Sequence, residues 1–175
     1  VYAGGRLFYT DEGVNYFFLG NIVDSKSMSN ITAARLQKLS AIKFESLPLD
    51  YAIKTVRGNG KRKVAVFSDP DCPYCKRLEK DLAKVTDVTI YTFLYPIASL
   101  HPDAARKSKL IWCAPNRQKA WDDYMLRGEL APEKSCDTPL DEIQAVGQKH
   151  KMNGTPTLVF ADGRVVPGAI PTSDM

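Results

Sequence analysis

Two cysteines separated by two residues, Cys72 and Cys75, lie in the stretch FSDPDCPYCKRLEKDL, residues 67–82. Such a pair can bind a metal, close a structural disulfide or carry out thiol–disulfide exchange. An apolar run precedes the pair and apolar residues at helical spacing follow it, so we expect a strand, a short loop and a helix that begins near Pro73. Unpaired N–H groups and the positive end of the helix dipole would then favour the thiolate form of Cys72. The pattern favours redox chemistry.

A metal site and a structural staple are the alternatives for this pair. Zinc usually takes four ligands, often from two close pairs of cysteine or histidine. The other cysteines, Cys113 and Cys136, are far apart in the sequence. The two histidines, His101 and His150, show no ligand spacing, so no metal is predicted, and we expect both at the surface or at helix ends, without a role. A disulfide across two residues closes so short a loop that it adds little stability.

The second pair of cysteines bears on stability and location. Four cysteines permit three pairings, but if Cys72 pairs with Cys75, the other two remain for each other. A bridge between Cys113 and Cys136 would stabilise the fold by roughly 3–4 kcal/mol in the chain-entropy model. Structural disulfides form in oxidising compartments, which predicts the periplasm or the outside of the cell.

Length and composition are those of an ordinary globular protein. The chain has 175 residues, enough for one domain and a small second region, and a formal charge of +4 that is spread along it. The basic block at residues 61–63 is interpreted as a solvated loop, so no nucleic acid is expected as a partner. No apolar run approaches the ~20 residues that a membrane-spanning helix needs. Because the chain starts at Val1 without methionine, we expect a processed product or a fragment.

The first part of the chain predicts a hairpin and a helix. Residues 6–10 and 16–20 flank Asp-Glu-Gly at 11–13, the pattern of two antiparallel strands with a short turn. Two strands alone are marginally stable, so this hairpin needs a partner. Apolar spacing predicts a linking helix from 29 to about 44, followed by a strand and a turn within 45–63.

The second part predicts a βαβ unit followed by helices and a hairpin. The apolar runs at 64–67 and 88–94 are expected to be buried parallel strands joined by the helix after the cysteines. Three helices are then expected: one from Pro102 to Trp112, one around Trp121 and Tyr124, and one that a capping box at 138–141 opens and Gly154 ends. Trp112, Trp121 and Tyr124 are predicted to belong to the core. Residues 157–160 and 164–166 predict a hairpin with the two-residue turn Asp162-Gly163.

Four segments together resemble one family of proteins. They are FSDPDCPYC at 67–75, Thr155-Pro156, Ile-Trp-Cys at 111–113 and Ser-Cys-Asp at 135–137. The chain resembles the DsbC/DsbG family of periplasmic disulfide isomerases from about Gly5 to its end. The resemblance implies a thioredoxin fold of α/β (α+β) class with an inserted helical subdomain at about 97–140. It divides the chain into a partial dimerisation-domain hairpin (1–28), a linker helix (29–45) and a catalytic domain (46–175).

The resemblance also implies roles for particular residues. Cys72 would be the exposed nucleophile and Cys75 the resolving thiol. The substrate would contact Pro73, Tyr74, Thr155 and Pro156, with Tyr74 on the exposed rim and the Thr155–Pro156 bond cis. Cys113 and Cys136 would form the structural bridge.

The implied activity is isomerisation or reduction of disulfides in misoxidised secreted proteins. A membrane-bound electron donor of the DsbD type would restore the reduced enzyme, and neither a metal nor an organic cofactor would be needed. The full-length family member is a homodimer through its N-terminal domain. The alternatives are a DsbG-like reductase or chaperone that protects single cysteines, and a non-catalytic binding module that keeps its cysteines oxidised.

Three departures from the family pattern have consequences. Thioredoxin has a buried carboxylate six residues before its first cysteine, where this chain has Val66, so proton transfer to Cys75 needs another route, such as water. Only the last part of the dimerisation domain matches. The chain stops at Met175, where the family continues into a terminal helix.

Overall fold

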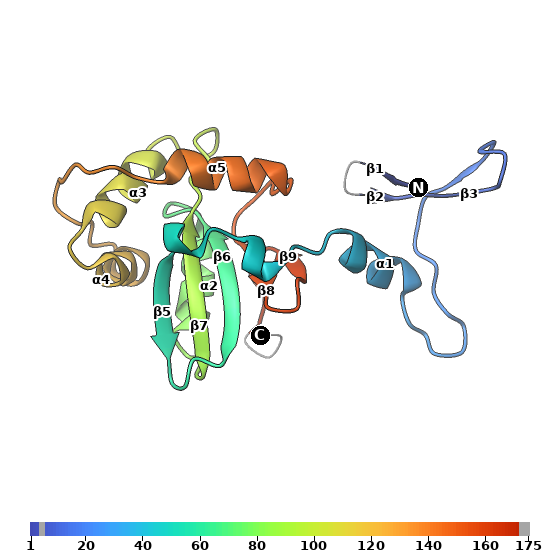
Figure 1. Cartoon of the computed structure of the whole chain (residues 1–175), viewed down its shortest axis with the longest axis horizontal. Coiled ribbons are helices and arrows are strands. Elements are labelled where there is room, and N and C mark those ends of the chain that lie inside the picture. The colour runs from blue at the N-terminus through green and yellow to red at the C-terminus, as the bar shows by residue number, and fades with distance from the viewer. Residues whose placement is uncertain (4–5, 172–175) are drawn as a thin grey trace. The chain divides into compact units, whose positions relative to one another are not determined.

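A five-stranded mixed sheet with the order β5-β7-β6-β8-β9 carries the cysteine pair (Figure 1). The computed structural model describes residues 1–3 and 6–171, so Gly5 and residues 172–175, at the two limits of the family resemblance, lie outside the described residues. The strands are β5 Ile53–Arg57, β6 Arg62–Ser68, β7 Val88–Leu94, β8 Thr157–Phe160 and β9 Val165–Pro167. The pair β6 and β7 is parallel and the other pairs are antiparallel, which confirms the predicted βαβ unit.

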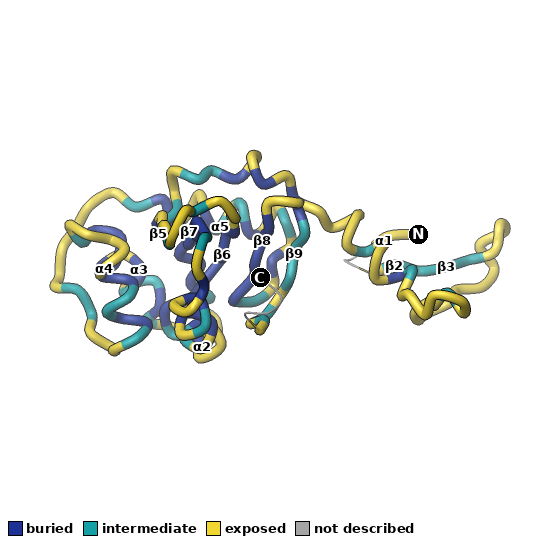
Figure 2. Tube along the Cα trace, turned by 90° about the horizontal axis from the view of Figure 1, so that it is seen from below, coloured by how far each residue is buried: buried dark blue, intermediate teal, exposed yellow. Residues whose placement is uncertain are grey.

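The helix α2, Pro73–Leu82, connects β6 to β7 and begins with proline at its first turn, as predicted. Leu78 and Leu82 are buried in one apolar cluster with residues of β6, β7 and β8. These three strands are buried along most of their length (Figure 2). Continuous apolar runs are typical of strands that are covered on both faces. The core of this unit therefore forms around the strand and helix that flank the cysteines.

Between β7 and β8 lie α3 Ala104–Cys113, α4 Arg117–Asp122, a π-helical turn η3 Asp123–Arg127, and α5 Leu140–Lys149. Figure 1 shows α3 and α4 beside the β5 edge of the sheet. Trp112, Trp121 and Tyr124 are buried, which confirms their predicted place in the core. The predicted capping box is wrong, because Pro139 is the N-cap of α5 and makes no side-chain cap. Helix α5 ends at Lys149, five residues before its predicted end at Gly154. Lys151, just after the helix, adopts a left-handed conformation.

The last hairpin has a longer turn than predicted. Phe160 donates its amide to the carbonyl of Arg164, so three residues, 161–163, form the loop. Gly163 has φ of 86°, the left-handed conformation that closes a three-residue hairpin loop. The turn between β5 and β6 was predicted correctly, and Gly58 and Gly60 supply its two left-handed positions.

The chain divides into two units, Val1–Ile42 and Lys43–Met175. In the first, β1 Tyr2–Ala3 pairs with β2 Arg6–Leu7, and β3 Tyr9–Thr10 pairs with β4 Phe17–Phe18. The predicted hairpin is therefore present but much shorter. Its loop is longer than the predicted turn, because the carboxylate of Asp11 accepts the amides of Asn15 and Tyr16.

The linking helix is also shorter than predicted. Helix α1, Ile31–Leu39, starts at the N-cap Asn30, whose side chain accepts the amide of Ala33. It stops at the cap Ser40, and two separate 3-10 turns follow, η1 Phe44–Ser46 and η2 Leu49–Tyr51. Among the described residues, no helix has the length and apolarity needed to cross a bilayer.

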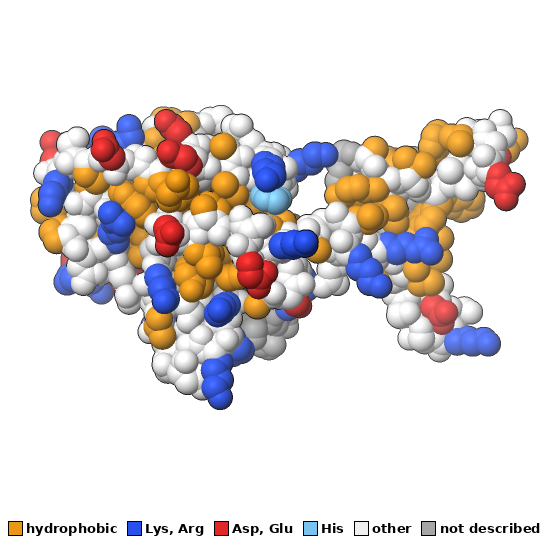
Figure 3. Space-filling view, in the orientation of Figure 1, with side chains coloured by type: hydrophobic (Ala, Val, Ile, Leu, Met, Phe, Trp, Pro, Cys, Tyr) orange, Lys and Arg blue, Asp and Glu red, His pale blue; other side chains and the backbone are white. Residues whose placement is uncertain are grey.

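The hairpin of the first unit exposes several apolar side chains. Exposed fractions are 74% for Tyr16, 58% for Phe17, 75% for Phe18 and 74% for Leu19. Figure 3 shows hydrophobic side chains gathered over this unit. A run of large, exposed apolar side chains is typical of an interaction surface.

Candidate active site

Two loops that are distant in sequence meet at one edge of the sheet. The antiparallel register of β6 and β8 pairs Phe67 with Thr157. The loop that follows β6 and carries Cys72 therefore lies beside the loop that precedes β8 and carries Thr155 and Pro156. The sheet register, rather than any local signal, brings these residues together.

Cys72 is the N-cap residue of α2, and its thiol is free. The Cys72 amide donates to the carbonyl of Asp69 at 3.2 Å. The thiol makes no capping bond to the helix and instead donates to the carbonyl oxygen of Thr155, at a sulfur–oxygen distance of 3.4 Å. The sulfur thus lies at the start of α2 and faces the opposite loop.

The expectation of an exposed Cys72 is wrong for this conformation. Only 4% of the residue is accessible, because its sulfur lies against the Thr155 carbonyl. Tyr74, two residues further, is 63% exposed, which agrees with its predicted place on the rim. An exposed aromatic side chain therefore lies two residues from a cysteine that is itself buried.

Cys75 differs from Cys72 in its surroundings. It is fully buried, and the amide of Asp69 donates to its sulfur at 3.4 Å. Burial raises the pKa of the Cys75 thiol to about 12, against the opposite effect of Ser68 and the Asp69 amide. Val66 of β6, the position at which thioredoxin has a buried carboxylate, is also fully buried, and its side chain is apolar. Cys75 is therefore a protonated thiol at neutral pH.

The loop opposite the cysteines has a cis peptide bond between Thr155 and Pro156. The carbonyl of Pro156 accepts the amide of Gly168 at 2.7 Å, and the hydroxyl of Thr157 donates to the carbonyl of Gly154. These bonds attach the loop on both sides. The Thr155 carbonyl is consequently held in place next to Cys72.

A groove borders this contact. It encloses about 620 Å³ between Tyr74, Arg77 and Asp81 of α2, Thr155 of the opposite loop, and residues 168–171. Side chains from α2 and backbone from the cis-proline loop are thus both accessible from one surface. The groove meets the cysteine pair through Thr155, whose carbonyl accepts the hydrogen bond from Cys72.

Asp69 is a residue of this site that the sequence analysis missed. Its side chain is fully buried; Oδ1 accepts the amide of Asp71 at 2.8 Å and Oδ2 accepts the amide of Ile97 at 2.7 Å. The ring nitrogen Nδ1 of His101 lies 3.0 Å from Oδ2, so His101 has a partner and is not merely a surface residue. An Asp that bonds the amide two residues later is a local turn signal, and the pattern Asp-Pro-Asp could have revealed it. Asp69 fixes the loop that carries Cys72.

The other two cysteines are joined to each other. Cys113, at the end of α3, forms a disulfide with Cys136, 23 positions further along the sequence, with an S–S distance of 2.02 Å. Within the described part of the chain, no group of three or more His, Cys, Asp and Glu side chains is placed to hold a metal ion.

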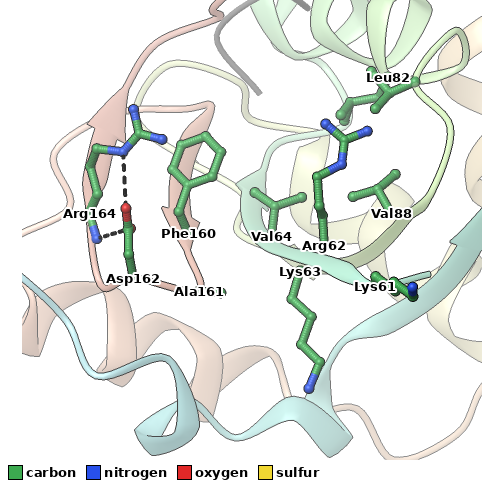
Figure 4. A pocket seen from close by; sticks show the side chains of 11 residues that line it. Lys61, Arg62, Lys63, Val64, Leu82, Val88, Phe160, Ala161, Asp162 and Arg164 are labelled. Carbon is green, nitrogen blue, oxygen red and sulfur yellow. Dashed lines mark hydrogen bonds and ion pairs between the residues drawn. The ribbon is translucent and has the colours of Figure 1, made fainter. Parts of the chain in front are cut away.

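A second hollow lies away from the cysteines (Figure 4). It encloses about 300 Å³, with an apolar floor that includes Val64, Leu82 and Phe160 and a basic rim that includes Arg164. Val64 lies near the start of β6, whereas Cys72 follows the end of that strand. The hollow therefore lies at the other end of β6, and we assign it no part in the chemistry of the cysteines.

Comparisons with known proteins give the family. Residues 49–175 match the model of the thioredoxin-like domain family. The probable thiol:disulfide interchange protein DsbC of Bordetella pertussis is 43% identical over the whole chain and 62% of its own length, so the chain spans about three fifths of that relative. The DsbC of Escherichia coli K12 is 30% identical over 98% of this chain and 71% of its own. A disulfide interchange protein from Neisseria gonorrhoeae, solved by crystallography, superposes with a TM-score of 0.71 and 56% identity over 73% of this chain and 92% of its own.

The fold, the cysteine pair beside the cis-proline loop and these similarities agree, and they confirm the predicted thioredoxin fold of α/β class. The chain belongs to the thioredoxin-like family and, within it, to the DsbC thiol:disulfide interchange proteins.

Proposed function

We propose that this protein is a disulfide isomerase and reductase that acts on misoxidised secreted proteins. The observation that carries the proposal is the contrast between the two cysteines. Cys72 lies at the start of α2 against the Thr155 carbonyl, and Cys75 is a buried, protonated thiol behind it. Cys72 thus lies where the two loops meet, next to a residue that lines the groove, whereas Cys75 is fully buried.

The first step joins enzyme and substrate. The thiolate of Cys72 attacks one sulfur of a substrate disulfide. A bond forms between Cys72 and that sulfur, the substrate S–S bond breaks, and the second substrate sulfur leaves as a thiolate. The product is a mixed disulfide, with no net change in the number of disulfides.

The second step has two outcomes. In isomerisation, another substrate thiolate attacks the mixed disulfide, forms a new substrate disulfide and releases the Cys72 thiolate. In reduction, Cys75 loses its proton, attacks the Cys72 sulfur and releases the substrate as a dithiol, while the enzyme becomes oxidised. The raised pKa of Cys75 keeps this second route slow, which favours isomerisation. A membrane-bound electron donor of the DsbD type would return the oxidised pair to dithiol.

Substrate binding is proposed to use the groove beside Cys72. An extended segment would contact Pro73 and Tyr74 on α2 and pair with the backbone at Thr155, while Pro156 shapes the loop. Such main-chain pairing is independent of the substrate sequence. Binding would also displace the Thr155 contact and so uncover the Cys72 sulfur.

Three further proposals concern the whole protein. Residues 1–28 would be part of a dimerisation domain, and residues 29–45 would be a linker. The exposed aromatic side chains of the hairpin support a homodimer of the full-length protein. The bond between Cys113 and Cys136 would be structural, which supports the periplasm because disulfides persist in oxidising compartments. Residues 46–175 would form the catalytic domain, with its helical insertion at about 97–140.

Refolding of a protein with scrambled disulfides tests the activity. Cys72→Ala is expected to abolish reshuffling, because no thiolate remains to attack. Cys75→Ala is the matched variant, which should keep reshuffling and accumulate mixed disulfide that non-reducing electrophoresis detects. Reshuffling by Cys72→Ala at the parent rate would refute the proposal.

The low exposure of Cys72 favours one alternative, a binding module whose cysteines do not react. Aggregation of an unfolded substrate, measured in the same samples, separates the two. A parent protein that suppresses aggregation but reshuffles no disulfides would establish the binding module, or a DsbG-like protector of single cysteines if it reduces a sulfenic acid.

A further inference from the structure

A carboxylate lies immediately before Cys72 in the sequence, and two residues of the helical insertion bind it. Oδ1 of Asp71 accepts hydrogen bonds from Nζ of Lys107 and from the hydroxyl of Tyr124, each at 2.7 Å. Lys107 belongs to α3 and Tyr124 to the π-helical turn η3. Two separate elements thus converge on the residue next to the reactive cysteine.

These contacts are partly buried and supported by neighbours. The side chains of Lys107 and Asp71 are only 20% and 17% exposed. Nζ of Lys107 lies 5.5 Å from the centre of the Tyr124 ring, and Nζ of Lys76 lies 4.9 Å from it. π-helical turns are rare and occur frequently at functional sites, and this one presents Tyr124 to the cluster. The cluster is therefore more buried than a typical surface ion pair.

The charges in the cluster are fixed at neutral pH. Burial acts to raise the pKa of Asp71, but the hydrogen bonds from Lys107 and Tyr124 outweigh it and the pKa is lowered. The pKa of Lys107 is raised, because the same bond to Asp71 outweighs its own burial. Asp71 is thus an anion and Lys107 a cation, and their charges cancel.

A free carboxylate at position 71 would repel a thiolate at position 72, since a neighbouring like charge disfavours ionisation. We propose that Lys107, assisted by Tyr124, is a positioning residue that binds the Asp71 carboxylate and cancels its charge beside Cys72. This inference rests on the proposed function, because it concerns the thiolate that performs the exchange. Other charged or titratable groups around the loop include Asp69, Cys75, Lys76, Arg77, His101, Asp103 and Arg106.

The pH dependence of Cys72 alkylation by iodoacetamide tests the inference. Cys75→Ala is used as the parent, so that Cys72 is the only free thiol among the described residues. Lys107→Met should raise the alkylation midpoint by about 0.5–1 pH unit, below the 1–3 units of a close unscreened charge because the cluster is partly solvated. Asp71→Asn should lower it by a similar amount, and the double variant should return near the parent.

Two further variants give controls. Lys109→Met removes the same charge from an exposed position of α3 and should leave the midpoint unchanged. Tyr124→Phe removes a hydrogen-bond donor without changing charge, so its upward shift should be smaller than that of Lys107→Met. Thermal unfolding of each variant shows whether it folds.

The outcomes are distinct. Equal midpoints for Lys107→Met and Lys109→Met would overturn the inference, while reshuffling by the protein with both active-site cysteines would leave the proposed function standing. Should Lys107→Met not fold, an unchanged midpoint in Asp71→Asn would overturn it equally. If the protein that keeps both Cys72 and Cys75 does not reshuffle disulfides, the proposed function is refuted instead.

Discussion

Glu79 is a buried carboxyl on α2 whose ionisation should weaken the folded state. The residue is only 6% exposed, and within the part of the chain that the structure describes its Oε1 has no hydrogen-bond partner. Burial raises the pKa of Glu79 to about 7; Trp121 and Arg57 favour the charged form and Asp122 opposes it. Replacement by glutamine keeps the shape and removes the charge.

The sign and size follow from this pKa. The folded protein keeps a proton on Glu79 that the unfolded chain releases above pH 4.5, the ordinary value. The stability that the protonated Glu79 contributes to the folded state is complete below pH 4.5 and is lost as the pH rises to about 7. At ~1.4 kcal/mol for each pH unit, a rise from 4.5 to about 7 corresponds to about 3 kcal/mol. The difference in unfolding free energy between Glu79→Gln and the parent should therefore grow in favour of the variant by about 2–3 kcal/mol as the pH rises from 5 to 8.

Urea unfolding at pH 5, 6, 7 and 8 measures this difference. The comparison of variant with parent cancels the contributions of titratable groups that both proteins share and that do not interact with Glu79. Glu133→Gln, at an exposed position, is the matched control and should show no such trend. A difference between Glu79→Gln and the parent that is the same at pH 5 and pH 8 would refute the reasoning.

Two further predictions concern packing and the second cysteine pair. Gly147→Ala should lose about 1–3 kcal/mol of stability in urea unfolding, because a Cβ there would overlap the buried ring of Tyr95; unchanged stability would contradict this. The double variant Cys113→Ala with Cys136→Ala should lose about 3 kcal/mol, because the bond joins residues 23 positions apart, and it should unfold like the reduced parent. A double variant as stable as the oxidised parent would show that the bond does not stabilise the fold.

Much of the second unit, Lys43–Met175, could be predicted because its signals are local. The apolar runs of β6 and β7 and the spacing of α2 each lie within about ten residues, so periodicity alone placed them. Boundaries failed where a single backbone contact decides them. Examples are the early end of α1 at Ser40 and the left-handed Lys151 that ends α5.

The apolar spacing that follows the cysteines and the proline at position 73 predicted by themselves that Cys72 and Cys75 would lie at the start of a helix, where residues three apart share one turn. The sequence could not determine how far each thiol is buried. The contact of Cys72 with Thr155 spans 83 residues, and that between Asp71 and Tyr124 spans 53. Only the register of the sheet and the docking of the helical insertion bring such residues together, so the surroundings of the reactive sulfur are a property of the tertiary structure.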